Sequence, residues 1–233
     1  MTSPARAGFD LPPIAPDGVD GSRRARQVAY ERLRQAILLG RIPVGAVLDT
    51  SALADELEMS RTPVREALQQ LLQERLVERG QRRQMVVRRI PDGERHEIFL
   101  MRDALERSVV RRAAEAISED HLDELRALLY RQRRAGQDGD LERFILLDER
   151  FHFRLAEAAS LPMFRKVLGE LRAFIRLIGF AAVAQPGRME QVAAEHEAVL
   201  EALEKRDPQL AAERMGIHLK ATEEVLGQRH RGG

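Results

Sequence analysis

Residues 50–72, reading TSALADELEMSRTPVREALQQLL, constrain the fold of this chain more than any other stretch. Leu53 and Leu57 lie four residues apart, a spacing that places them on one face of a short helix. A second helical pattern opens at Ser60, whose hydroxyl is expected to cap it, with Pro63 in its first turn, where a missing backbone N–H costs nothing. The stretch therefore predicts two short helices joined by a tight turn. We expect a hydroxyl at residue 50 or 51 to cap the first helix.

The beginning of the second helix carries side chains that suit nucleic acid. Arg61, Thr62 and Arg65 fall outside the apolar stripe that begins at Val64 and continues through Leu68. A helix N-terminus offers free N–H groups and partial positive charge, so arginines there can meet phosphates and guanine edges. On this stretch alone, an ordinary helix pair with solvated arginines remains open.

The flanking segments add a helix and a hairpin to this pair. Residues 28–39 show the spacing of an amphipathic helix that ends at Gly40. Residues 76–79 and 85–88 read as two strands around a turn at residues 80–84, with Arg82 and Arg83 at the tip. The N-terminal part is thus predicted to be a winged helix-turn-helix.

Residues 28–89 resemble the winged helix-turn-helix of the GntR family of bacterial transcription regulators. The resemblance is strongest in the run SRTPVREAL, residues 60–68. It implies sequence-specific, usually dimeric, binding to a double-stranded DNA operator. The expected DNA-contacting residues are Ser51, Ser60, Arg61, Thr62, Arg65, Arg82 and Arg83. Where the family's wing usually has a glycine, this chain has Arg82-Arg83-Gln84, which indicates a longer or differently shaped wing.

Charge and composition agree with this interpretation. Residues 21–90 hold 14 Lys and Arg against 8 Asp and Glu, whereas the whole chain has a net charge of only +1. A basic excess on the helix-turn-helix segment suits a polyanionic partner. The absence of cysteine excludes disulfides and thiolate metal sites, and no apolar run approaches the length of a membrane span. We therefore expect a cytoplasmic protein that does not enter the membrane.

The remaining chain divides into a tail, a break and a helical region. Residues 1–20 are rich in proline and glycine without periodicity, so a disordered tail is expected, followed by a DNA-binding domain over residues 21–90 with its helix-turn-helix at about 50–69. The basic run at 21–27 is expected to be solvated and to precede the first helix. Residues 90–94 break the pattern, and residues 94–228 contain six helical segments, which predict an all-α, bundle-like ligand domain and a mainly α protein.

Asp148 and His152 lie four residues apart on the third of these helices, so both point from one face. His196 and His218 lie on the fifth and sixth helices. If the three helices meet, one carboxylate and three imidazoles can enclose a divalent ion. From spacing alone, separate histidines with local partners remain the stronger alternative.

The helical region is similar to the FCD effector domain of the FadR-like branch of the GntR family. The matching pieces are Met101-Arg102 through Glu106, the run DERFH at 148–152, Glu195-His196 and His218. The resemblance implies that Asp148, His152, His196 and His218 bind a metal, which we expect to be zinc, nickel or manganese. It also implies that Arg102 pairs with a ligand carboxylate; a surface salt bridge to Glu106 is the alternative.

Together these features predict a homodimeric, DNA-binding transcription regulator, with repression as the expected mode, controlled by a small organic-acid effector. We expect no enzymatic activity. Two alternatives remain open. One is a metal-dependent enzyme in which the three histidines and Asp148 hold an activated water. The other is a DNA-binding protein whose helical domain only dimerises.

Overall fold

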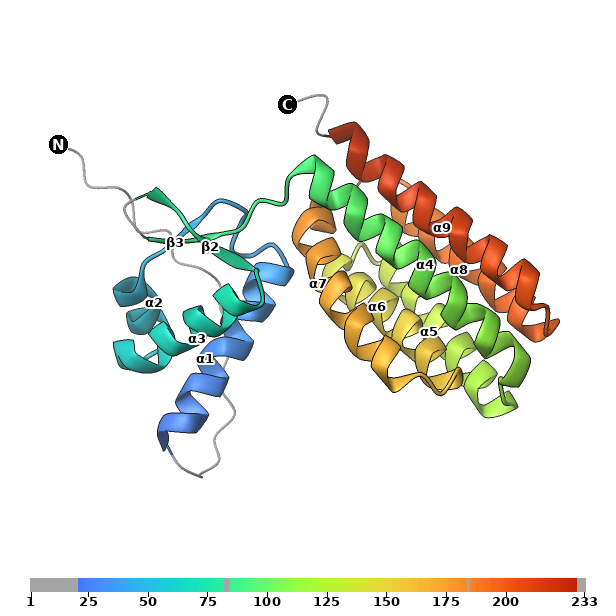
Figure 1. The fold of residues 1–233 in the computed structure, drawn as a ribbon, viewed down its shortest axis with the longest axis horizontal. Coiled ribbons are helices and arrows are strands. Elements are labelled where there is room, and N and C mark those ends of the chain that lie inside the picture. Colours follow the sequence, from blue (N-terminus) through green and yellow to red (C-terminus); the bar gives the residue numbers. More distant parts are fainter. Residues whose placement is uncertain (1–20, 82–83, 184, 230–233) are drawn as a thin grey trace. The chain divides into compact units, whose positions relative to one another are not determined.

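The computed structural model describes residues 21–81, 84–183 and 185–229. The chain forms two compact units, Met1–Arg89 and Ile90–Gly233 (Figure 1). The expected disordered tail and the wing-tip residues Arg82 and Arg83 lie outside the described residues. Among the helices that the structure describes, none combines the length and the hydrophobicity that crossing a membrane requires.

The first unit is a winged helix-turn-helix. Its elements are α1 (Gly21–Leu38), β1 (Val47–Leu48), α2 (Thr50–Glu56), α3 (Arg61–Gln73), β2 (Val77–Arg79) and β3 (Met85–Val87). The three short strands form an antiparallel sheet in the order β1-β3-β2, with β3 paired to both neighbours. The predicted helix pair and two-stranded wing are therefore present, and β1 is an additional strand that the sequence did not indicate.

Two local expectations in this unit need correction. The cap of α2 is Asp49, whose side chain accepts the Ala52 N–H at 2.8 Å, and not a hydroxyl at residue 50 or 51. Ser60 does occupy the N-cap position of α3, but its hydroxyl makes no capping bond. The Asp49 carboxylate accepts the same backbone hydrogen bond, and its negative charge also interacts favourably with the positive N-terminal end of the helix.

Helix α1 begins at Gly21 and not at Val28, so the basic run at 21–27 forms its first turns. Ala, Arg and Gln have high helix propensity, so the polar run extends the amphipathic helix. Arg23 and Arg26 are exposed, as expected of a solvated segment.

The second unit contains the six helices predicted from the sequence. They are α4 (Asp92–Ala116), α5 (Glu119–Gln137), α6 (Leu141–Ala158), α7 (Pro162–Val183), α8 (Arg188–Glu204) and α9 (Pro208–Arg229). Their starts are fixed locally: the Ser118 hydroxyl caps α5, and the Asp140 carboxylate caps α6. Together the six helices extend from Asp92 to Arg229.

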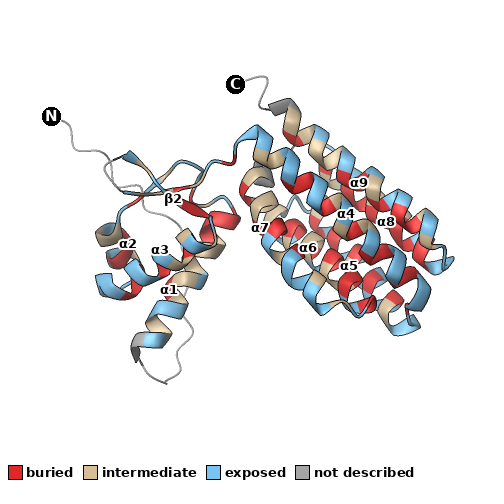
Figure 2. Ribbon diagram, viewed as in Figure 1, coloured by how far each residue is buried: buried red, intermediate tan, exposed pale blue. Residues whose placement is uncertain are grey.

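The core of the helical unit is built mainly from alanine, leucine and valine of α4, α5, α6, α8 and α9, with Phe151 fully buried. Figure 2 shows the buried positions as stripes facing the interior of the bundle. Eight of the described polar or charged side chains are also buried, and all eight belong to the helical unit: Arg102, Glu106, Gln132, His152, Arg172, Arg188, His196 and His218. Because burial of polar groups is costly unless they are paired, their concentration in one unit marks a site.

Candidate metal centre and nucleic-acid interface

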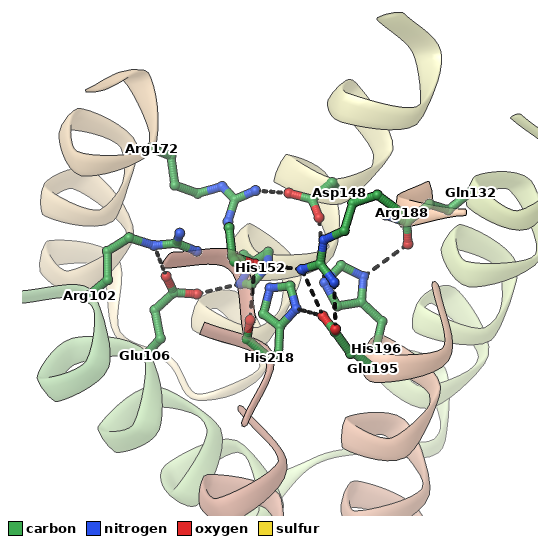
Figure 3. Close-up of polar contacts among 11 residues, drawn as sticks. Arg102, Glu106, Gln132, Asp148, His152, Arg172, Arg188, Glu195, His196 and His218 are labelled. Atoms are coloured by element: carbon green, nitrogen blue, oxygen red, sulfur yellow. Dashed lines mark hydrogen bonds and ion pairs between the residues drawn. The ribbon is translucent and has the colours of Figure 1, made fainter. Parts of the chain in front are cut away.

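Three helices bring the predicted ligand residues together. Asp148 and His152 come from α6, His196 from α8 and His218 from α9. One ligand atom of each lies within 4.8 Å of the ligand atoms of the other three. All three imidazoles are buried. Figure 3 shows their rings turned toward one another, and the His196 and His218 ring centres lie 4.6 Å apart.

Each histidine contacts an oxygen atom through Nδ1 on the side away from the cluster (Figure 3). His196 Nδ1 lies 2.9 Å from the amide oxygen of Gln132, and His218 Nδ1 lies 2.7 Å from a carboxylate oxygen of Glu195. His152 Nδ1 contacts Glu106 Oε2. An oxygen acceptor holds the proton on Nδ1, so Nε2 keeps its lone pair and can bind a metal.

The rings are also held by packing. His196 stacks on Phe151, with ring centres 4.3 Å apart and planes 11° apart. Phe151 is itself part of the bundle core. The orientation of His196 is therefore fixed by an aromatic face as well as by its Nδ1 partner.

The electrostatics of the cluster favour the protonation states that ligands need. Burial, followed by the charge of Arg172, lowers the pKa of His152 to about 4. Burial and the neighbouring His218 lower the pKa of His196 well below its usual value. Burial would raise the pKa of Asp148, but Arg172 and the histidines outweigh it and lower that pKa. At neutral pH His152 and His196 are therefore neutral and Asp148 is ionised, the forms that coordinate metal.

The described residues fit a divalent ion. The Nε2 atoms of His152 and His196 are buried without a hydrogen-bond partner among the described residues. Unpaired buried nitrogens are costly, and a metal ion would satisfy them. Three imidazoles and one carboxylate are a donor set for zinc, nickel or manganese. Asp148 can contribute one oxygen because its other oxygen faces Arg172.

Arg102 combines features of both predicted alternatives. It donates from Nε to Glu106 Oε1 at 2.6 Å, yet this ion pair is buried and not on the surface. Arg102 also lines a cavity, together with Asp148 and His218. Arg102 therefore forms an ion pair with Glu106 and also lies in the wall of the cavity.

Five residues of the site were missed by the sequence interpretation as functional positions: Glu106, Gln132, Arg172, Arg188 and Glu195. Glu106, Gln132 and Glu195 contact the three histidines. Arg172 contacts Asp148, and Arg188 forms two hydrogen bonds to Glu195. A signal was present for Gln132: it follows Leu122, Leu125 and Leu129 at helical spacing, so a polar residue occupies the apolar stripe.

In the first unit, the four predicted contact residues at the start of α3 lie on the surface. Ser60, Arg61, Thr62 and Arg65 are exposed, and Ser51 is partly exposed. Opposite them on α3, Val64, Leu68 and Leu71 are buried. The helix therefore presents two guanidinium groups and two hydroxyls to solvent at its N-terminal end.

The C-terminal end of α3 is attached to α1. Glu74, which ends α3, accepts hydrogen bonds from the Tyr30 hydroxyl and from Arg34 Nε, the latter at 3.2 Å. Burial, together with the bond to Glu74, raises the pKa of Tyr30 to about 12, so this hydroxyl stays a donor. These contacts fix the orientation of α3 within its unit.

Comparison with known proteins identifies two matched regions. Residues 25–87 match the bacterial regulatory proteins of the gntR family, and residues 97–221 match the FCD domain. The second match alone spans more than half of the chain.

The chain is similar along most of its length to several regulators. It is 28% identical to the HTH-type transcriptional repressor RspR of Escherichia coli (strain K12), over 87% of this chain and 89% of that protein. It is 30% identical to the probable D-xylose utilization operon transcriptional repressor of Paenarthrobacter nicotinovorans, over 85% and 89%. A regulator in an unstable DNA locus of Streptomyces ambofaciens is also 30% identical, over 85% and 84%.

Solved structures share the fold. E. coli McbR/YncC superposes with a TM-score of 0.78 at 23% identity, over 88% of this chain and 98% of that one. A putative GntR regulator from Rhodococcus sp. RHA1 gives a TM-score of 0.75 at 22% identity, with the same coverage.

Proposed function

The chain belongs to the GntR family of bacterial transcription regulators, in the FadR-like branch with an FCD domain, and from this premise we propose how it is controlled. A small organic acid binds in the helical unit beside a divalent metal ion, and this binding changes the affinity of the helix-turn-helix for an operator. The family consists of transcription regulators and not of enzymes, which removes the metal-dependent enzyme from consideration.

The observation that carries the effector proposal is the arrangement of the three imidazoles, which face one another while each contacts an oxygen atom outside the cluster through Nδ1. Each imidazole has an oxygen atom in contact with Nδ1, and the Nε2 atoms of His152 and His196 form no hydrogen bond among the described residues. A purely structural histidine usually satisfies both nitrogens or exposes one to water. Four metal-ligating atoms beside a cavity suit a metal ion that a small molecule can reach through the cavity.

Asp148, His152, His196 and His218 would hold the ion. When bound, zinc, nickel or manganese would supply a Lewis-acidic centre that attracts a carboxylate. The chain's own residues do the rest: Glu106, Gln132 and Glu195 orient the imidazoles, and the arginines at the cavity supply positive charge. The partners of the imidazoles support this role because such contacts typically change metal affinity ten- to a hundredfold.

For DNA binding, we propose that residues 21–90 act as the DNA-binding domain and residues 94–228 as the effector domain. Exposure of Ser60, Arg61, Thr62 and Arg65 supports direct contact of the start of α3 with an operator. A homodimer would place two such helices in successive major grooves of a near-palindromic site. Two of the relatives are described as repressors, which supports repression, and action on chromosomal DNA supports a cytoplasmic location.

The coupling between the two sites need not be large. A ligand that changes operator affinity between fivefold and about a hundredfold supplies ~1–3 kcal/mol of coupling free energy. By linkage, operator DNA then changes the affinity for the effector by the same factor. Effector affinity measured with and without operator DNA therefore tests the coupling, and this test does not require the genes that the protein regulates to be known.

The experiment measures fluorescence anisotropy of duplexes from the DNA upstream of the chain's own gene, with a scrambled duplex as control, at fixed salt. Metal-loaded protein should bind the upstream duplex at least a thousandfold more tightly than the scrambled one. An organic acid that binds the protein should shift this affinity. Equal affinity for both duplexes would refute the operator assignment at this site.

A DNA-binding protein with an inert helical dimerisation domain remains the second candidate. It predicts that EDTA treatment and metal reloading leave the stability of the helical unit unchanged. Our proposal predicts that zinc, nickel or manganese raises its melting temperature, because an ion that binds only the folded state stabilises it.

A further inference from the structure

The cavity next to the metal-ligating residues lies within the helical unit. The space free of atoms in it, including its opening, amounts to about 650 Å³. Asp148 and His218 form part of its wall, together with four arginines: Arg102, Arg172, Arg176 and Arg188. The charges and contacts of these arginines indicate which chemical groups a ligand can present.

Most of these guanidinium groups are committed to carboxylates of the chain. Arg188 donates to both oxygens of Glu195, at 2.7 and 3.3 Å, and also to Thr222 and Gln191, which uses all four of its Nη hydrogens. Arg176 pairs with Glu149 at 2.8 Å. Arg102 pairs with Glu106 and lies over the ring of Phe99.

Arg172 differs from these arginines. Its Nη2 contacts Asp148, but its Nε and Nη1 are buried without a hydrogen-bond partner among the described residues. The residue is 4% exposed and lines the cavity. Figure 3 shows its guanidinium beside Asp148, near the histidine cluster. Buried donors without hydrogen-bond partners are costly, so these nitrogens of Arg172 can donate hydrogen bonds to an acceptor that enters the cavity.

The rest of the cavity wall is apolar except for Thr222, whose hydroxyl accepts a hydrogen bond from Arg188 and donates one to the His218 carbonyl oxygen. The aliphatic and aromatic side chains that line it come from α6, α7, α8 and α9: Phe144, Ile145, Ile175, Val183, Val192, Val225 and Leu226. These side chains favour hydrocarbon and offer no donor to an anionic group that lies against them. The cavity therefore has one polar end, at Arg172 and the metal ligands, and an apolar body.

We propose that the effector is a monocarboxylate with an apolar body, whose carboxylate pairs with Arg172 and whose hydrocarbon lies against the wall that Val192 and Val225 help to form. This inference rests on the proposed function, since it names the class of organic acid that the same site takes. Dicarboxylates and tricarboxylates are discriminated against, because their further carboxylates would be buried against the apolar side chains of this wall.

The expected discrimination follows from elementary magnitudes. Each buried CH₂ contributes ~0.8 kcal/mol, which corresponds to about fourfold in affinity. Affinity should therefore rise from acetate through butyrate to valerate by roughly fourfold per carbon that fits. Glutarate has the length of valerate but ends in a second carboxylate, so it should bind at least tenfold more weakly than valerate. Pentan-1-ol lacks the carboxylate and should show no measurable binding.

The experiment is isothermal titration of the full metal-loaded chain with acetate, butyrate, valerate, glutarate and pentan-1-ol, with metal content measured in each sample. Preference for valerate over glutarate supports the inference. Equal or tighter binding of glutarate overturns it and leaves control by an organic acid intact. If none of the acids binds, both this inference and the effector part of the proposed function fail.

Two variants separate the carboxylate end from the apolar body. Arg172→Lys keeps the charge but loses the planar fork, so affinities for acetate and valerate should fall by the same factor. Val192→Thr replaces one methyl group of the wall with a hydroxyl, so the ratio of valerate to acetate affinity should fall. An unchanged ratio in Val192→Thr, or unchanged affinities in Arg172→Lys with full metal content, would refute the assignment.

Discussion

The His196→Leu substitution gives the sharpest test of the metal centre. His196 Nε2 is buried 3.5 Å from Asp148 Oδ1 and has no hydrogen-bond partner among the described residues, a condition that costs ~1–3 kcal/mol in the absence of metal. Leucine removes that cost but leaves the Gln132 amide oxygen without its partner, which costs a similar amount. We therefore expect the metal-free variant to be about as stable as the metal-free parent.

The metal response should differ strongly between the two proteins. An ion at a hundredfold excess over its dissociation constant stabilises the folded parent by ~2.7 kcal/mol. In a unit of this size, 1 kcal/mol corresponds to roughly 3 °C in melting temperature, so the expected shift is about 8 °C. The His196→Leu variant loses one ligand of four and should show almost none of this shift.

The assay is differential scanning fluorimetry after EDTA treatment, with and without zinc, nickel or manganese. His96→Gln is the matched control, because His96 is exposed and pairs with Glu223 away from the cluster, so its metal shift should equal that of the parent. The double variant His196→Leu/Gln132→Leu should be more stable than the metal-free parent, since both unpaired groups are gone. A full metal shift in His196→Leu would refute the assignment of this centre.

Three further predictions concern other residues. Gln132→Leu alone should weaken metal affinity ten- to a hundredfold without abolishing it, measured by competition with a metal-binding dye; unchanged affinity would show that Gln132 does not orient His196. Arg65→Ala should lower operator affinity by ~1–3 kcal/mol in anisotropy titrations, whereas Arg112→Ala, exposed on α4, should not; equal effects would place DNA elsewhere. Gly45 has φ +83° with open space around it, so Gly45→Ala should destabilise the winged unit by ~1 kcal/mol in urea unfolding, while Gly93→Ala, in the first turn of α4, should not destabilise the helical unit.

The helices could be predicted from the sequence because their boundaries are local. Ser118 and Asp140 cap the helices they precede, and Pro162 and Pro208 open the next ones. These signals depend on residues within one turn of each other. The strand β1 was missed for the opposite reason: it has two residues, and it exists because Val47 and Leu48 pair with a strand almost forty residues later.

The ligand residues could be proposed but not assembled from spacing. Asp148 and His152 share a face of α6 by helical geometry alone. That His196 and His218 meet them depends on how α6, α8 and α9 pack, which no local pattern specifies. The resemblance to FCD domains supplied the missing step, and the structure then placed the four ligand atoms within 4.8 Å of one another.

The buried polar partners were missed although their positions were informative. Arg102 and Glu106 were interpreted through their i, i+4 spacing, which fits a surface salt bridge. They also continue the stripe from Ile98 to Val109, so on an amphipathic helix they had to face the interior. A charged pair there is costly unless further groups complete it, and in the structure His152 contacts the free oxygen of Glu106. The position of a charge on the helix, more than its spacing to an opposite charge, therefore distinguishes a ligand-supporting pair from a solvated one.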